Sequence, residues 1–168
     1  MKSLQETQVK KLEMDKPDFS KKLYNIINQN EIYGSLLEID ERGSLAEITT
    51  QKTTYSVKRL GFFNPYITIR KGKFETNEAI AYLNLRGETA ITLDNETFYF
   101  KIQNFWKNQW CWTNEKHQVI ITFKPIISGT VKGDIEISKE ALHYSQLELL
   151  ALLGVYFMVK YQSEIENN

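Results

Sequence analysis

The feature that most constrains the fold of this chain is an apolar run close to its C-terminal end. Residues 149–159 contain no charged side chain and no polar group other than the Tyr156 hydroxyl. A helix that is apolar on every side must be covered on every side. The run is also shorter than the ~20 apolar residues that a membrane-spanning helix needs. We therefore predict no transmembrane span but a buried core helix over residues 145–162.

Two further observations concern this helix. Ser145 followed by Glu148 matches a capping box, in which each side chain bonds to the backbone N–H of the other residue. Gly154 lies in the middle of the helix, where glycine costs about 1 kcal/mol relative to alanine. We expect the compensation to be a strand or a large ring that packs where a Cβ would clash.

The preceding part of the chain consists of short predicted strands. From Leu23 onward apolar and polar residues alternate, and turn residues recur at intervals of about 8 to 12 residues. With the enclosed helix, this predicts a mainly β fold: a closed antiparallel β-barrel of roughly 10–12 strands with a buried hydrophobic C-terminal helix. Residues 23–168 would form this domain. The polar residues 1–22, interrupted by Pro17, would form a short helix or a disordered segment.

Composition narrows the classes of function. Lysine plus arginine and aspartate plus glutamate both number 21, so the net charge is zero. This argues against a protein built mainly to neutralise nucleic-acid phosphates. Cys111 is the only cysteine, so no intrachain disulfide forms. Because the N-terminal residues also lack the apolar stretch of a signal peptide, we expect a cytoplasmic protein.

Candidate catalytic residues are few. His117 and His143 are the only histidines, and acidic residues are not spaced with them as a nucleophilic site requires. A hairpin would bring Cys111 near His117 by geometry alone, and a free cysteine usually serves as a small hydrophobic residue. The sequence has no metal-ligand spacing and no glycine-rich phosphate loop. We expect no enzymatic activity, no metal and no cofactor, unless a deep polar cleft has one of the histidines at its floor.

Four segments carry a resemblance to a known family. They are the Asp-Glu-Arg-Gly turn at residues 40–43, Phe-Tyr-Phe at 98–100, Trp-Cys-Trp at 110–112, and the strand at 129–137 before the Leu-rich helix. In this order they resemble the tubby C-terminal domain, whose arrangement is shared by the plant LURP-one-related proteins and the phospholipid scramblases. The resemblance covers residues 23–162 and is architectural, because this superfamily has no short signature.

The resemblance implies a barrel threaded by its C-terminal helix. It also implies a domain that binds phosphoinositide head groups through basic side chains on the barrel. The chain lacks the proline-rich leader and the cysteine cluster of the scramblases, so lipid scrambling is not implied. A shared fold is an analogy for function and not evidence of it.

Five cations near two predicted strand ends are the candidate ligands for lipid phosphate. Lys58 and Arg59 end one predicted strand, and Arg70, Lys71 and Lys73 lie at the end of the next. If these ends are neighbours, the side chains converge on one barrel rim, where arginine offers a bidentate fork and lysine a point charge. Each cation near an anionic membrane contributes about 1 kcal/mol. The alternative is a solvated strand edge that lysine protects against aggregation.

A second candidate surface is aromatic. Phe105 and Trp106 lie beside Lys107 in a predicted loop, and rings next to cations hold single-stranded nucleic acid in barrel domains. Trp110 and Trp112 share one face of a strand, where we expect them to pack in the core. Trp106 is the ring that we most expect to be exposed.

We therefore predict a non-catalytic intracellular binding domain that docks on anionic lipid or phosphoinositide head groups through the basic rim, peripheral to the membrane. The alternative is a single-stranded nucleic-acid or protein-interaction module that uses the aromatic surface around Trp106. Nucleic acid is the less expected partner because the net charge is zero.

Overall fold

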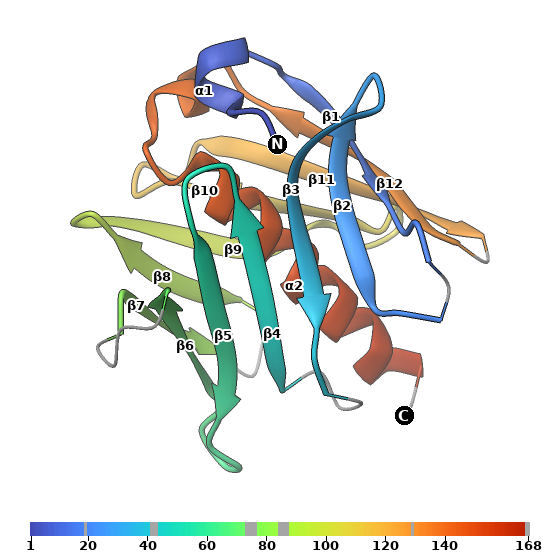
Figure 1. Ribbon diagram of the computed structural model, residues 1–168. Helices are drawn as coiled ribbons and strands as arrows, with labels where there is room; N and C mark the ends of the chain where they lie inside the picture. Colours follow the sequence, from blue (N-terminus) through green and yellow to red (C-terminus); the bar gives the residue numbers. More distant parts are fainter. Residues whose placement is uncertain (19, 41–43, 73–76, 84–87, 129, 167–168) are drawn as a thin grey trace.

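The computed structural model of the protein describes residues 1–168 except 19, 41–43, 73–76, 84–87, 129 and 167–168. Within these residues twelve strands form a closed antiparallel barrel (Figure 1), in which strands adjacent in sequence pair and β1 pairs with β12. This confirms the predicted fold class. The strands are β1 (Lys11–Asp15), β2 (Leu23–Asn28), β3 (Glu31–Glu38), β4 (Leu45–Thr50), β5 (Thr54–Leu60), β6 (Tyr66–Lys71), β7 (Ala79–Leu83), β8 (Thr89–Leu93), β9 (Glu96–Asn104), β10 (Gln109–Thr113), β11 (Val119–Ser128) and β12 (Thr130–Ile137).

The strands alternate in direction, so every second connection lies at the same end of the barrel. The described connections after even-numbered strands lie at what we call the upper end, which faces the upper left in Figure 1. The short helices α1 (Leu4–Thr7) and η1 (Glu140–His143) also lie there. The described connections after odd-numbered strands lie at the opposite, lower end, where the C-terminal helix finishes.

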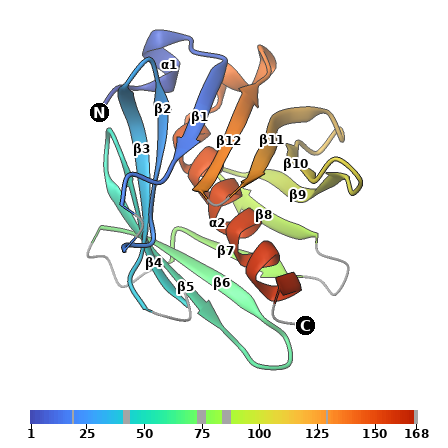
Figure 2. The same ribbon diagram turned by 90° about the vertical axis from the view of Figure 1, so that its right-hand side faces the viewer.

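The helix α2 (Leu147–Glu166) occupies the inside of the barrel, as Figures 1 and 2 show from two sides. Its residues 147–158 are all buried. Phe157 packs against the inward-facing rings of Phe100 and Trp112, both 0% exposed. The predicted buried helix is thereby confirmed. No described helix is long and apolar enough to cross a membrane.

Gly154 marks a very close approach of the barrel wall to α2. A Cβ built at this position would lie 2.2 Å from Cζ of the Phe123 ring. Phe123 is 1% exposed and packs edge-on against Phe100, so the ring is enclosed on its other side. The expectation of a large ring against this glycine is confirmed.

The helix begins close to the predicted position, but its polar partners differ from those of a capping box. The Ser145 hydroxyl donates to Oδ2 of Asp94 at 2.7 Å. The buried Glu148 carboxylate accepts from the Ser3 hydroxyl at 3.0 Å and from the Leu4 backbone N–H at 2.8 Å. The prediction of a capping box is wrong because the N-terminal segment, far away in sequence, supplies the donors to Glu148.

The N-terminal segment belongs to the barrel. Residues 11–15 form β1, which pairs with both β12 and β2, and the inward-facing Leu12 and Met14 are each 2% exposed. The predicted domain boundary at residue 23 is therefore corrected to include this strand. Two apolar side chains are too few to reveal the two-residue alternation of a strand in the sequence. They are nevertheless enough to anchor a strand of five residues to the core. The expected short helix is present as α1, whose Leu4 is 0% exposed.

Candidate functional site

The strand register separates the predicted phosphate-binding cations. β5 and β6 form an antiparallel hairpin in which Lys58 lies opposite Thr68 and Arg70 opposite Ser56. Lys58 and Arg70 are exposed and are diagonal neighbours on the outer wall of the barrel. Lys73 lies outside the described residues. Two of the five predicted side chains therefore share one surface.

Arg59 and Lys71 lie at opposite ends of this hairpin, because β6 runs back along β5. Arg59 is near the lower end, and Lys71 is at the upper end. There, hydrogen bonds from Ser145 and Gln146 lower the pKa of Asp94, and the charge of Lys71 lowers it further. The described cations thus do not converge on a single rim. Their binding to lipid phosphate stays a prediction.

Two turns at the lower end of the barrel carry four exposed aromatic side chains, which we call the lower-end rings. Phe62 and Phe63 in the β5–β6 turn are 91% and 87% exposed, and Phe105 and Trp106 in the β9–β10 turn are 70% and 93% exposed. Each pair makes an edge-to-face contact, with ring centroids 5.1 Å and 6.0 Å apart. Gly61, with φ of 80°, permits the tight first turn. At these exposures the rings project into solvent.

The described turns at the upper end are polar instead. They include residues 29–30, 51–53, 94–95 and 114–118, all of which have polar or charged side chains. The described upper-end turns are therefore hydrogen-bonding, whereas the lower end combines two turns with aromatic tips and a mostly polar β1–β2 connection, in which Ser20 donates to Asp18.

The sequence identified half of the lower-end rings. Phe105 and Trp106 are exposed as predicted, and Trp110 and Trp112, at 2% and 0% exposure, are the core residues expected. Phe62 and Phe63, at residues 61–65, are not among the predicted surface rings. Two phenylalanines between a glycine and an Asn-Pro pair were the available sign of an apolar turn.

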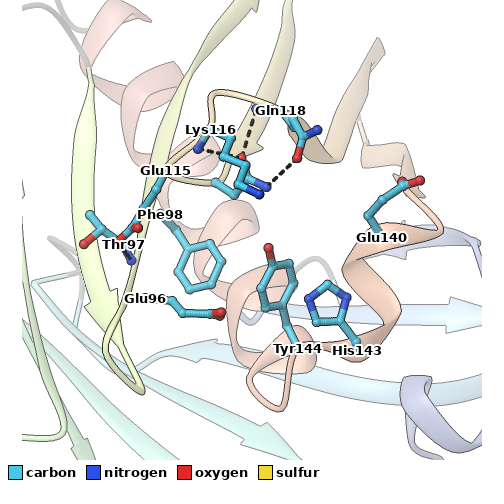
Figure 3. A pocket seen from close by; sticks show the side chains of 10 residues that line it. Glu96, Thr97, Phe98, Glu115, Lys116, Gln118, Glu140, His143 and Tyr144 are labelled. Atoms are coloured by element: carbon cyan, nitrogen blue, oxygen red, sulfur yellow. Dashed lines mark hydrogen bonds between the residues drawn. The ribbon is translucent and has the colours of Figure 1, made fainter.

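A pocket of about 340 Å³ opens at the upper end, between the start of β9, the β10–β11 turn and η1 (Figure 3). Tyr144 is the most buried polar residue of its lining, at 9% exposure. Figure 3 shows its hydroxyl pointing into the pocket, between Phe98 and His143. The lining consists mainly of polar side chains: Glu96, Thr97, Phe98, Asn114, Glu115, Lys116, Gln118, Glu140, His143 and Tyr144.

Hydrogen bonds within the β10–β11 turn fix one wall of the pocket. Oδ1 of Asn114 accepts from the backbone N–H groups of Lys116 and Gln118, both at 3.0 Å. The Asn114 amide also donates to Oε1 of Gln118 at 3.0 Å. Glu115 accepts from the Thr97 backbone N–H at 3.0 Å, which ties the turn to β9. This wall is therefore in place before any ligand binds.

The pocket does not assemble a nucleophilic site. His143 is exposed at its side, and no serine or cysteine is among the described lining residues. Cys111 is fully buried in β10, and this burial raises the pKa of its thiol. Among the residues that the structure describes, no group of three or more potential metal ligands occurs. The expected lack of enzymatic activity stays a prediction.

A buried ion-pair cluster lies at the lower end of the barrel. The Glu38 side chain is 2% exposed, and its carboxylate lies 3.0 Å from Nζ of Lys160 and 3.4 Å from Nζ of Lys22. Burial, together with the charge of Glu38, raises the pKa of Tyr24 to about 12. Lys160 thereby ties the later turns of α2 to the end of β3.

We expect Glu38→Gln to lower the free energy of unfolding by about 3 kcal/mol, because Lys160, whose side chain is 12% exposed, then loses the buried carboxylate that compensates its charge. Urea denaturation at neutral pH measures the change. Glu136→Gln is the control, since Glu136 pairs with Lys124 at the surface, at 2.8 Å. An exposed pair contributes about 1 kcal/mol or less. Equal losses in the two variants would contradict the structural role of Glu38.

No protein-family model, curated protein or solved structure matches this chain. The resemblance to the tubby C-terminal domain therefore stays a prediction, although the structure does have a barrel that encloses its C-terminal helix. The geometry of the chain itself carries the functional proposal.

Proposed function

We propose that this protein is a non-catalytic binding module that docks the lower end of its barrel onto an anionic lipid surface. The observation that carries the proposal is the set of lower-end rings, which are between 70% and 93% exposed on two turns of the same end. Aromatic side chains are favoured at the membrane–water interface. Complete burial of one large apolar side chain contributes about 1.5–3 kcal/mol. Four such rings at one end are an ample source of affinity.

The spacing of the rings favours a lipid surface over a single protein partner. β7 and β8 separate the two turns, and neighbouring strands lie about 4.8 Å apart, so the turns are roughly 19 Å apart along the barrel wall. Figure 2 shows them as separate projections. Two turns that lie far apart can each insert their rings into a fluid bilayer, whereas the residues that contribute most to a protein interface cluster near its centre.

Two lysines beside the rings favour anionic lipid. Lys107 directly follows Trp106, and Lys58 lies on the outer wall near the β5–β6 turn. Neither lysine forms an ion pair with another described residue. Each cation near an anionic surface contributes about 1 kcal/mol. Because the net charge is zero, we assign most of the affinity to the rings and the choice of lipid to these cations.

Co-sedimentation with vesicles tests the proposal. Vesicles of phosphatidylcholine alone are compared with vesicles that also contain phosphatidylserine or a phosphoinositide, at low and at physiological salt. The wild type is expected to bind anionic vesicles, and more strongly at low salt. Phe62→Ser combined with Trp106→Ser is expected to lower the partition coefficient about 100-fold, because two rings no longer enter the interface.

Controls separate the contributions of the rings and the charges. Ile32→Ser removes an apolar side chain that is 40% exposed near the upper end, and it is expected to leave binding unchanged. Lys58→Glu combined with Lys107→Glu is expected to remove the preference for anionic vesicles. A blue shift of tryptophan emission on vesicle addition reports on Trp106, since the other two tryptophans are already buried. Undiminished binding by the double serine variant would contradict the proposal.

A single-stranded nucleic-acid or protein-interaction module is the second candidate. Trp106, 93% exposed and next to Phe105 and Lys107, offers a stacking surface beside a cation. The zero net charge weighs against it, because phosphate contacts dominate nucleic-acid affinity. Quenching of Trp106 emission by oligothymidine, without any binding to vesicles, would select this candidate.

A further inference from the structure

The charged residues of the barrel strands are divided unevenly between two halves of the barrel. The neighbouring strands β5–β10, which we call the basic half, contain a single acidic residue, Glu96 at the upper end of β9. Their basic residues are Lys58, Arg59, Arg70, Lys71 and Lys101. The remaining strands, β11, β12 and β1–β4, form the acidic half, whose basic residues are Lys11, Lys124 and Lys132. Its acidic residues are more numerous: Glu13, Asp15, Glu31, Glu38, Glu47, Asp134 and Glu136.

The basic half also carries all the lower-end rings, because the β5–β6 and β9–β10 turns both belong to it. Two tyrosines lie on the wall between these turns, Tyr66 at the start of β6 and its cross-strand partner Tyr82 near the end of β7. The adjacent Ile67 and Ala81 are 1% and 0% exposed and face the core, so the tyrosines face outward. Tyr82 is 64% exposed. An aromatic surface therefore continues from the first turn along the wall toward the second.

The wall across the barrel from these tyrosines has the opposite character. In the closed order of the strands β1 is as far from β7 as a strand can be, so the two lie on opposite sides. Glu13 on β1 is the cross-strand neighbour of Asp134 on β12, and both residues are exposed. The β1–β2 connection below them is mostly polar. An anionic surface repels these carboxylates, whereas it attracts the cations of the basic half.

We propose that the docked barrel leans toward its basic half, so that the wall of β5–β10 faces the anionic lipid and the acidic half faces away. The inference rests on the proposed lipid docking and adds the side of the barrel that the membrane contacts. Tyr66 and Tyr82 then enter the interface beside the lower-end rings, where a tyrosine buries its ring and keeps its hydroxyl hydrated. Lys58 and Lys101 face the lipid head groups, because the adjacent Val57 and Phe100, both 0% exposed, point into the core.

A fluorescent label on each wall tests the inclination. Tyr82→Cys and Glu13→Cys in the full-length protein each carry one polarity-sensitive thiol label, and the native Cys111 does not compete for it because it is 0% exposed. Both positions lie close to the lower end of their strands. On addition of vesicles that contain phosphatidylserine, the label at position 82 is expected to shift its emission to the blue. The label at position 13 is expected to keep its emission unchanged.

Two matched lysine variants test the role of charge. Lys101→Gln and Lys124→Gln each remove one cation from the outer wall, the first in the basic half and the second in the acidic half. Lys101→Gln is expected to lower the partition coefficient on these vesicles about fivefold at low salt. Lys124→Gln is expected to leave it unchanged, because β11 faces away from the lipid. Equal losses in the two variants would overturn the proposal, since only the overall charge would then matter.

The labels also separate this inference from lipid docking itself. A wild type that neither co-sediments with the vesicles nor shows a blue shift of Trp106 emission would overturn both proposals. Vesicle binding without a shift at position 82, or with equal shifts at positions 82 and 13, would overturn the inclination alone. A shift at position 82 that appears without vesicles as the protein concentration rises would assign this wall to a second copy of the chain, which also overturns the proposal.

Discussion

Replacing Leu153 by lysine is expected to abolish cooperative folding of the barrel. Leu153 is 0% exposed in the middle of α2, and the side chains on both sides of it along the helix are buried as well. An unpaired charge at this position costs several kcal/mol. Small domains are stable by only about 5–15 kcal/mol in total. Near-UV circular dichroism of the buried tryptophans and urea denaturation measure the loss.

A volume-conserving change is the control for this variant. Leu153→Met keeps an apolar side chain of similar size and is expected to cost less than about 1.5 kcal/mol. The contrast between the two variants isolates the effect of charge from that of shape. A Leu153→Lys protein that stays soluble and unfolds cooperatively would show that the helix is not enclosed.

The enclosed helix was predictable because its sequence leaves few alternatives. The apolar run at residues 149–159 needs cover on every side, and the period-two segments before it supply a wall. The mid-helix Gly154 signals a close neighbour for the same local reason. Each of these inferences depends on neighbouring residues in the sequence, which are the ones that pattern and propensity describe well.

Long-range partners were not predictable from local patterns. Glu148 has the spacing of a capping box with Ser145, yet its donors are Ser3 and Leu4 at the other end of the chain. The upper pocket likewise combines β9, the β10–β11 turn and η1, which only the closed barrel brings together. No spacing in the sequence reveals such a constellation.

The predicted convergence of the five cations and the missed pairing of the two aromatic turns have one cause. Neither prediction followed the alternating direction of the strands. An antiparallel turn places the end of β5 beside the start of β6, so Lys58 and Lys71 are separated along the hairpin. The same reasoning brings the lower-end rings together. Four strands, β6 to β9, lie between residues 61–65 and 105–108, and an even number of strands returns the chain to the same end of the barrel.

Gly154→Val is expected to destabilise the protein about as severely as a core charge. The Cβ alone would lie 2.2 Å from the Phe123 ring, and valine adds two methyl groups to that overlap. Overpacking a core typically costs about 1–3 kcal/mol and occasionally more. We expect a loss at or above the top of this range, because Phe123 is itself enclosed. Urea denaturation of the purified variant measures it.

Gly154→Ala is a smaller change at the same position. Whether it raises or lowers the free energy of unfolding distinguishes an exposed helix from one enclosed by the barrel. On an exposed helix Gly154→Ala would stabilise the protein by about 1 kcal/mol, since alanine has the better helix propensity. In the enclosed helix the methyl group of alanine would overlap with the Phe123 ring, so Gly154→Ala is expected to destabilise the protein.

Phe123→Leu removes the end of the ring that meets the methyl group. In this background Gly154→Ala is expected to cost at least about 1 kcal/mol less, a coupling typical of residues in direct contact. Additive effects of the two substitutions would place the ring away from Gly154, and a stabilising Gly154→Ala would place the helix outside the barrel wall.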